Sequence, residues 1–249
     1  MAVELSKVYA VWLREVKRFT NSKSRMIGSL GMPLFFLIAL GGGIGALIPE
    51  FNYQAFILPG IIGMTILFNS LFAGVSIIWD RELGYLKELL VAPTSRTTIV
   101  IGRALGGATT SVTQGILILV LGILLGLTAP TLHGALFAII IMGIFATLIV
   151  SIGIAFASVI TEVETFQLIV NLIMMPLFFL SNALFPMEKM PVWLKDLSSL
   201  NPVSYGVDAL RTMITGAGSI PIMVDIGVLV VMLAAALGIA GFLFNKTSI

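Results

Sequence analysis

The stretch PLFFLSNALFPMEKMPVWLKDLSSLNPVSYGVDALR, residues 176–211, decides the fold that we expect for this chain. An apolar run ends at Pro186, and a short amphipathic segment, residues 187–200, follows in place of an ordinary polar loop. Pro202 then opens a second short helical pattern over residues 203–215. Each segment is shorter than the roughly 20 residues that a helix needs to cross a bilayer. We therefore expect two re-entrant half-helices that lie at the membrane surface or dip into it, capping or lining a passage.

The composition of the whole chain predicts an all-α integral membrane protein. Of its 249 residues, 58% are hydrophobic and 10% are charged, whereas soluble domains carry about 25% charged residues. The mean hydropathy is +1.10. We expect one transmembrane domain over residues 1–249, without room for a separate soluble domain and without a cleavable signal peptide. The absence of cysteine excludes disulfides and thiol catalysis.

Six apolar runs have the length of transmembrane helices. They cover residues 26–48, 55–79, 99–127, 135–160, 166–185 and 222–244. Eleven of the 14 Lys and Arg residues lie before the first run, within residues 80–103 around the start of the third run, or after the sixth. Since cytoplasmic loops carry an excess of Lys and Arg, we expect a multi-pass protein of the cell membrane with both termini in the cytoplasm. The half-helices of residues 186–215 then lie on the external side.

Residues 1–25 predict an amphipathic helix at the cytoplasmic membrane surface. Apolar side chains recur at helical spacing on one face and basic side chains occupy the other, as in helices that lie on anionic lipids. The apolar face holds Leu5, Val8, Tyr9, Trp12, Val16 and Phe19. Two interpretations stay open: a simple topological anchor, or a surface helix that also contacts a cytoplasmic partner.

A second informative stretch, DRELGYLKELLVAP, begins the cytoplasmic connection of residues 80–98. It predicts a helix with Leu83, Leu86 and Leu90 in one stripe, ended by Pro93. Such a short helix gains little stability alone in water, so its leucines need a partner surface. The membrane surface and a groove on a soluble subunit both fit. A solvated extension of the second span is the third possibility.

Together the two stretches resemble the permease subunits of ABC-2-type transporters, above all the drug- and polysaccharide-exporting permeases of bacteria and archaea. The pattern FP…P-x-W-L…NP-x-x-Y-x-x-D-x-x-R carries most of the resemblance, which covers essentially the whole chain. The resemblance implies a permease homodimer that pairs with two separate ABC ATPase subunits, with no nucleic acid involved. ATP and Mg would bind the ATPase, and this chain would carry no cofactor and no metal.

The resemblance also implies roles for individual residues. The connection after the second span would sit in a cleft of the ATPase through Arg81, Glu82, Gly84, Leu86, Glu88, Leu89 and Pro93. The half-helices would form an external gate, with Phe185, Pro186, Trp193, Asn201, Pro202, Tyr205, Asp208 and Arg211. Export is the direction that the resemblance implies.

The chain lacks the motifs of an enzyme that works alone. No G-x-x-x-x-G-K-[ST] sequence is present, so ATP hydrolysis requires another chain. The single histidine, His133, cannot build a zinc site, and no paired carboxylates lie within a span. We therefore expect a transport subunit without catalytic residues.

Neutral polar residues within the spans are candidates for a substrate pathway. These are Asn69, Gln114, Asn171 and Asn182. Hydrogen bonds between helices are the alternative role for each. Gly102-x-x-x-Gly106 and Gly122-x-x-x-Gly126 permit close helix packing, either between subunits or within one.

The central parts of the spans hold almost no ionisable groups, which disfavours ion coupling and favours an external energy source. A hydrophobic, amphiphilic or lipid-linked substrate agrees with this lack of charge. A passive channel or membrane scaffold, and an ion-coupled secondary transporter, stay as alternatives.

Overall fold

The computed structural model describes residues 4–47, 52–85 and 94–246, and in these ranges every regular element is a helix. The elements are α1 (Leu5–Thr20), α2 (Lys23–Leu47), α3 (Tyr53–Ala73), α4 (Val75–Glu82), α6 (Arg96–Leu124), α7 (Leu132–Val159), α8 (Val163–Phe179), the 3₁₀ turn η1 (Met187–Lys189), α9 (Val192–Ser199), α10 (Pro202–Thr215) and α11 (Ile222–Lys246). The expectation of an all-helical membrane protein is confirmed.

Five helical segments are long and apolar enough to cross a membrane. They are Met26–Leu47, Tyr53–Glu82, Arg96–Leu124, Leu132–Val159 and Ile222–Lys246, which correspond to five of the six predicted spans. The remaining predicted span, residues 166–185, corresponds to α8, which has only 17 residues. At 1.5 Å per residue α8 is about 26 Å long, somewhat less than the roughly 30 Å of a hydrocarbon core. A count of six spans stays a prediction.

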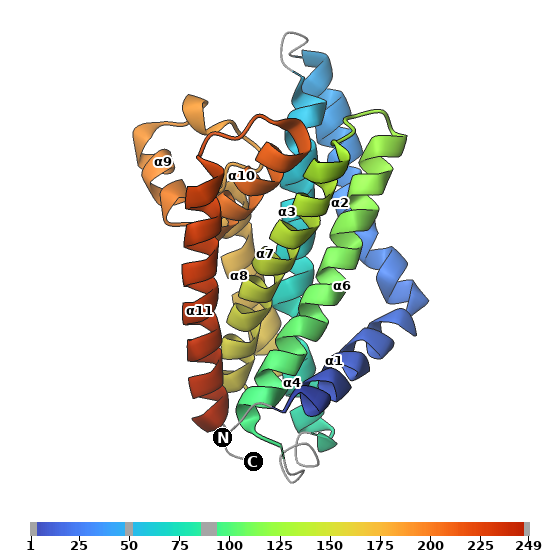
Figure 1. The fold of residues 1–249 in the computed structure, drawn as a ribbon, viewed down its shortest axis with the longest axis vertical. Coiled ribbons are helices and arrows are strands. Elements are labelled where there is room, and N and C mark those ends of the chain that lie inside the picture. The colour runs from blue at the N-terminus through green and yellow to red at the C-terminus, as the bar shows by residue number, and fades with distance from the viewer. Residues whose placement is uncertain (1–3, 48–51, 86–93, 247–249) are drawn as a thin grey trace.

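The spans form an elongated bundle around α3, with α1 and α4 at one end and α9 and α10 at the other (Figure 1). In α3 with α4, 78% of the most apolar window is buried, compared with 17% in both α2 and α11. The central helix therefore contacts protein on most sides, whereas α2 and α11 lie at the periphery and present large apolar surfaces outward.

Local sequence chemistry sets the ends of several helices. The side chain of Ser95 accepts a hydrogen bond from the backbone N–H of Thr98 at the start of α6, and Thr131 does the same for α7. Asn201 caps α10, whose first residue is a proline without an N–H to satisfy. Gly216 ends α10 in the left-handed conformation, with φ of 73°.

The N-terminal helix α1 packs directly on α6. A Cβ atom added at Gly102 would lie 2.7 Å from the Cβ of Val11, and one at Gly106 would lie 2.6 Å from the Cβ of Glu15. These two glycines therefore let α1 approach α6 closely. Part of the apolar face of α1 is buried in this contact, including Val8 and Val11.

Three of the four motif glycines, Gly102, Gly106 and Gly122, thus permit close packing within one subunit in this structure. A Cβ at Gly122 would lie 2.6 Å from a methyl group of Leu58, so this glycine makes room for α3. Gly126, with φ of 74°, lies in the turn that follows α6.

The two expected half-helices correspond to η1 with α9, and to α10. Most side chains of α9 are exposed, whereas ten of the 14 residues of α10 are buried. The second segment therefore packs into the end of the bundle, against α3, α7 and α11. The re-entrant arrangement relative to a membrane stays a prediction.

We expect Gly102→Val to loosen α1 from α6 because the added methyl groups collide with Val11 and with the backbone of Val8. Overpacking of this kind costs about 1–3 kcal/mol. Thermal unfolding in detergent should show a lower melting temperature, and limited trypsin digestion should release α1 faster. Gly143→Val is the matched control, since no atom lies within 4 Å of a Cβ at Gly143. Equal effects of the two variants would contradict the close contact.

Candidate functional site

A buried ionic cluster joins α1, α4 and α6 at the end of the bundle where the connection of residues 80–98 begins. Asp80, whose side chain is 2% exposed, accepts a hydrogen bond of 2.8 Å from Nη2 of Arg14 in α1. Its Oδ2 also pairs with Arg103 of α6, whose side chain is 3% exposed. Arg18 lies 3.5 Å from Oδ1. One carboxylate at the end of α4 therefore binds guanidinium groups from two other helices.

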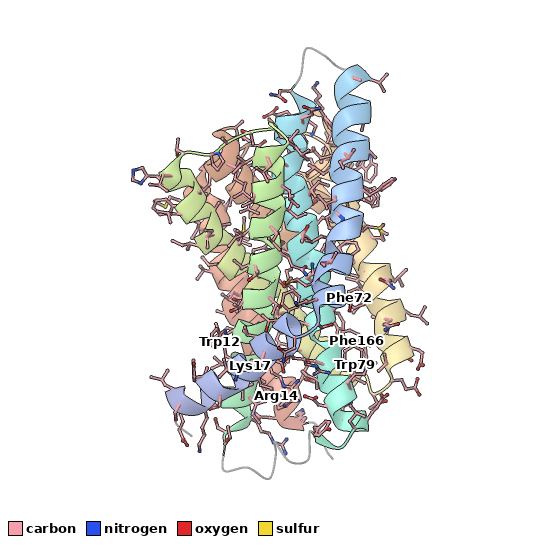
Figure 2. All side chains as sticks on the ribbon, turned by 90° about the vertical axis from the view of Figure 1, so that its right-hand side faces the viewer. Trp12, Arg14, Lys17, Phe72, Trp79 and Phe166 are labelled. Atoms are coloured by element: carbon pink, nitrogen blue, oxygen red, sulfur yellow. The ribbon has the colours of Figure 1, made fainter. Side chains whose placement is uncertain are left out.

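Further contacts fix this cluster, here called the Asp80 cluster. The guanidinium of Arg18 lies 5.5 Å from the centre of the Trp79 ring, and Arg103 donates a 3.3 Å hydrogen bond to the hydroxyl of Ser76. Figure 2 shows Trp12 and Arg14 on α1 beside the helix that carries Trp79. Trp12 donates a 2.9 Å hydrogen bond to Thr109 of α6. The pair with Arg103 is the most buried, so removal of either partner would leave the other as a buried charge with fewer counterions.

The predicted coupling residues begin directly after Asp80. Arg81 donates hydrogen bonds to the carbonyls of Ile160 and Ala157, at 3.1 and 3.3 Å. Glu82 is the last residue of α4 and is exposed, and Gly84 adopts a positive φ of 80° in the turn that follows. The remaining coupling residues lie outside the described part of the chain: Leu86, Glu88, Leu89 and Pro93.

The four predicted lining residues do not gather in one place. Asn69 and Gln114 line the same small polar cavity of about 50 Å³ beside the Asp80 cluster. Asn171 is exposed on α8, and Asn182 is buried at the opposite end. Gln114 donates a hydrogen bond to Ser29 of α2, which links two helices. Contact of these residues with a substrate stays a prediction.

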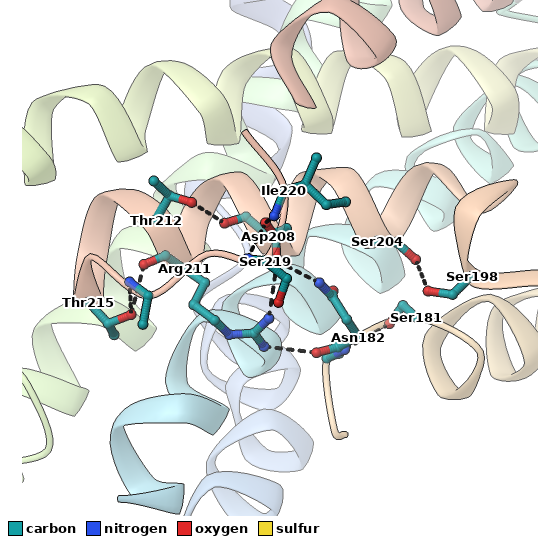
Figure 3. Close-up of polar contacts among 12 residues, drawn as sticks. Ser181, Asn182, Ser198, Ser204, Asp208, Arg211, Thr212, Thr215, Ser219 and Ile220 are labelled. Atoms are coloured by element: carbon teal, nitrogen blue, oxygen red, sulfur yellow. Dashed lines mark hydrogen bonds and ion pairs between the residues drawn. The ribbon is translucent and has the colours of Figure 1, made fainter. Parts of the chain in front are cut away.

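A second polar cluster, here called the Asp208 cluster, lies at the end of the bundle that carries α9 and α10 (Figure 1), and Figure 3 shows its contacts. Asp208 of α10 is fully buried and accepts a 2.8 Å hydrogen bond from the side-chain amide of Asn182. It also accepts hydrogen bonds of 2.9–3.1 Å from the backbone N–H groups of Ser219 and Ile220. Asp208 therefore ties α10 both to the segment after α8 and to the loop that leads into α11.

Arg211 is the cation of the Asp208 cluster. Its Nη1 lies 3.7 Å from Oδ1 of Asp208, and its Nη2 donates a 2.8 Å hydrogen bond to the carbonyl of Asn182. Its guanidinium lies 4.0 Å from the centre of the Phe56 ring of α3. Burial lowers the pKa of Arg211 to about 10 against the opposing effects of Asp208 and Glu188. Arg211 therefore stays a cation at neutral pH.

The other predicted gate residues surround this cluster at the same end. Asn201 donates a 2.6 Å hydrogen bond to the carbonyl of Leu177, and Tyr205 donates one of 2.6 Å to the carbonyl of Ser199. Pro202 is the first residue of α10, and Pro186 caps η1. Two large side chains are exposed, Phe185 at 51% and Trp193 at 63%. A gate function for this group stays a prediction.

The sequence analysis did not predict which charged residues are buried. The sequence patterns did not predict the common contact of Asp80, Arg14 and Arg103. Asp225, in the first turn of α11, is fully buried, and both its carboxylate oxygens lack a hydrogen-bond donor among the described residues. Opposite charges at the facing ends of two consecutive spans were the available signal for Asp80 and Arg103.

The fold and the two clusters define a multi-pass helical membrane protein that is braced by buried ion pairs at both ends of its bundle. The chain belongs to the ABC-2 type transporter family, whose model matches residues 6–215.

Three relatives illustrate the similarity. The chain is 28% identical to the inner membrane transport permease YadH of Escherichia coli K12, over 91% of this chain and 90% of that protein. It is 34% identical to the protein named ycf38 of Cyanophora paradoxa, over 79% of this chain and 71% of that protein. It is 24% identical to nodulation protein J of Rhizobium leguminosarum bv. viciae, over 88% of this chain and 86% of that protein. The chain is thus a membrane transport permease of the ABC-2 type, a subunit that associates with an ABC ATPase.

We expect Asp208→Asn to lower stability strongly because it leaves the Arg211 cation buried without a counterion. Removing one partner of a buried pair costs about 3–5 kcal/mol. The double variant Asp208→Asn/Arg211→Met should recover part of the loss, as measured by thermal unfolding in detergent. Asp196→Asn, an exposed site on α9, is the control. A melting temperature of Asp208→Asn equal to that of the control would contradict the role of the ion pair.

Proposed function

We propose that this permease is an ATP-driven exporter that works as a homodimer with two ABC ATPase subunits. The ATPase subunits bind ATP and Mg and hydrolyse the nucleotide. Their closure moves the connection of residues 80–98, the spans rearrange, and the substrate leaves past the half-helices of residues 186–215. The termini and the connection face the cytoplasm.

The Asp80 cluster is the observation that carries this proposal. It anchors the end of α4 to α1 and α6 directly before the connection, so a force applied to the connection reaches three helices at once. Glu82 is exposed at the end of α4 and is therefore accessible to a soluble partner. The basic residues of α1 and of the connection support the cytoplasmic assignment.

The exposed apolar surface supports a dimer and an apolar substrate. Large hydrophobic side chains point outward from α2 and from α8: Ile27, Met32, Phe35, Ile38, Leu168, Leu172, Met175 and Phe179. A surface of this kind fits either lipid or a second subunit. The middle of the bundle holds few charges, which supports a hydrophobic, amphiphilic or lipid-linked substrate.

Charge reversal at Glu82 tests the ATPase contact. We expect Glu82→Lys to reduce the amount of partner ATPase that co-purifies with the permease by about tenfold, since one lost charge-assisted contact is worth about 1.4 kcal/mol or more. Asp196→Lys, an equal charge change at an exposed site of the opposite end, should leave co-purification unchanged. Unaltered ATPase binding by Glu82→Lys would remove the coupling role of this residue.

Reconstituting the permease with its ATPase distinguishes the exporter from an ion-coupled transporter and from a passive channel. Substrate-stimulated ATP hydrolysis by the reconstituted pair supports the exporter. Transport that collapses with the proton gradient while ATP persists would support an ion-coupled transporter. Transport by the purified permease alone would support a passive channel.

Neutralising Asp80 tests whether α4 transmits movement between the ATPase and the permease, and it does not test whether the ATPase binds. Asp80 is buried, so Asp80→Asn should leave ATPase co-purification intact but abolish the stimulation of ATP hydrolysis by the permease, because α4 is no longer held by the guanidinium groups of α1 and α6. Glu4→Gln, which removes an exposed carboxylate paired with Lys7, is the control. Full stimulation by an Asp80→Asn complex that has assembled normally would contradict this role.

A further inference from the structure

An apolar groove of about 600 Å³ runs along α7 and α11 on the outside of the bundle. All twelve of its lining side chains are apolar: six come from α7 and its C-cap, five from α11, and Ile169 comes from α8. Along α11 the groove exposes small residues, including Ala235. An apolar chain can therefore lie lengthwise between the two helices.

The length of the groove matches one leaflet of a bilayer. On α7 it extends from Leu148 to Ile160, which is about 18 Å of helix at 1.5 Å per residue. On α11 it extends from Met232 to Leu243, about 16 Å. Half of a hydrocarbon core is about 15 Å. The groove is thus about as long as one acyl chain in a leaflet. It ends at the end of the bundle that carries α1 and α4.

A cation with spare hydrogen-bond donors lies at this end. Arg81 is bound to the carbonyls of Ile160 and Ala157 through Nη1 and Nη2. Its Nε is buried and has no acceptor among the described residues. In the described part of the chain no carboxylate lies within 4.0 Å of this guanidinium. A guanidinium has five N–H donors, and a phosphate group suits those that the protein leaves unused.

One further cation and two exposed acids lie near this end of the groove. Arg96 of α6 donates a 2.6 Å hydrogen bond to the carbonyl of Asn245, two residues beyond the last groove residue of α11. The nearby acids Glu162 and Glu164 are exposed, and the carboxylate of Glu162 accepts a hydrogen bond from Thr165 of its own helix.

We propose that the groove binds an anionic phospholipid, with one acyl chain between α7 and α11 and the phosphate on Arg81. The lipid is a resident of the leaflet on the side of α1 and α4. By binding Arg81 it holds the end of α4 against α7, next to the segment that receives the ATPase.

Native mass spectrometry of the delipidated full-length permease in detergent tests this proposal. The probes are phosphatidylglycerol and phosphatidylcholine with identical acyl chains. We expect the wild type to bind phosphatidylglycerol about fivefold more tightly than phosphatidylcholine, the effect of one arginine near a membrane surface. Arg81→Gln should abolish this preference and leave the weaker binding of phosphatidylcholine.

Filling the groove tests the acyl-chain site separately. Ala235→Trp should weaken the binding of both lipids about tenfold, because the indole occupies the volume of the chain. Ala234→Trp is the matched control, since Ala234 is an exposed neighbour on α11 that does not line the groove. Equal melting temperatures of the two delipidated variants will show that both are folded.

Three results would overturn the proposal. The first is equal affinity of the wild type for the two lipids, and the second is lipid binding by Ala235→Trp that matches Ala234→Trp. The third is loss of the dimer in the mass spectrum of Ala235→Trp alone, which would identify the groove as an interface between two copies of the chain.

Discussion

The requirement that a buried carboxylate keep its cations constrains one whole end of this bundle. Asp80 is almost inaccessible and so is Arg103, and neither group can leave the pair without leaving the other charged in an apolar setting, which is strongly unfavourable. Arg14 brings α1 into the same contact. Close packing on Gly102 and Gly106 then fixes the distance between α1 and α6. An amphipathic helix that could have lain free on the membrane is thereby part of the folded bundle.

At the other end of the bundle, the Asp208 cluster uses buried charges to bind backbone groups. Between α8 and α11 the chain has irregular stretches, residues 180–186 and 216–221, whose buried backbone donors and acceptors need partners. Asp208 accepts from two backbone N–H groups, and Arg211 donates to a backbone carbonyl. The cluster therefore supplies the hydrogen bonds that a regular helix would make for itself. This explains why two charged residues are buried in an otherwise apolar helix.

Periodicity and length predicted the helices well, because a membrane span must satisfy its own backbone and must be long. Five predicted spans agree with the structure, and the punctuation at Pro186 and Pro202 correctly marked the short helices. Patterns within one segment could not reveal contacts between segments. The side chain of Asp80 meets Arg14 from 66 residues earlier, and Asp208 meets Asn182 from 26 residues earlier. A hydropathy pattern identifies Asp225 only as a charge near a span end, since burial depends on neighbours that the pattern does not contain.

The two clusters are joined by α3 and α4, which are separated only by Gly74. Helix α3 has 21 residues, which is about 32 Å at 1.5 Å per residue, and α4 follows it immediately with Asp80. At its opposite end, Tyr53 donates a hydrogen bond to the carbonyl of Leu184, and Phe56 lies under the guanidinium of Arg211. A rigid, buried helix of this length transmits displacement rather than absorbing it, because a packed core is difficult to deform. If a soluble partner moves α4, as proposed above, the movement has a direct physical route to η1, α9 and α10, provided that both ion-pair clusters stay intact while it occurs.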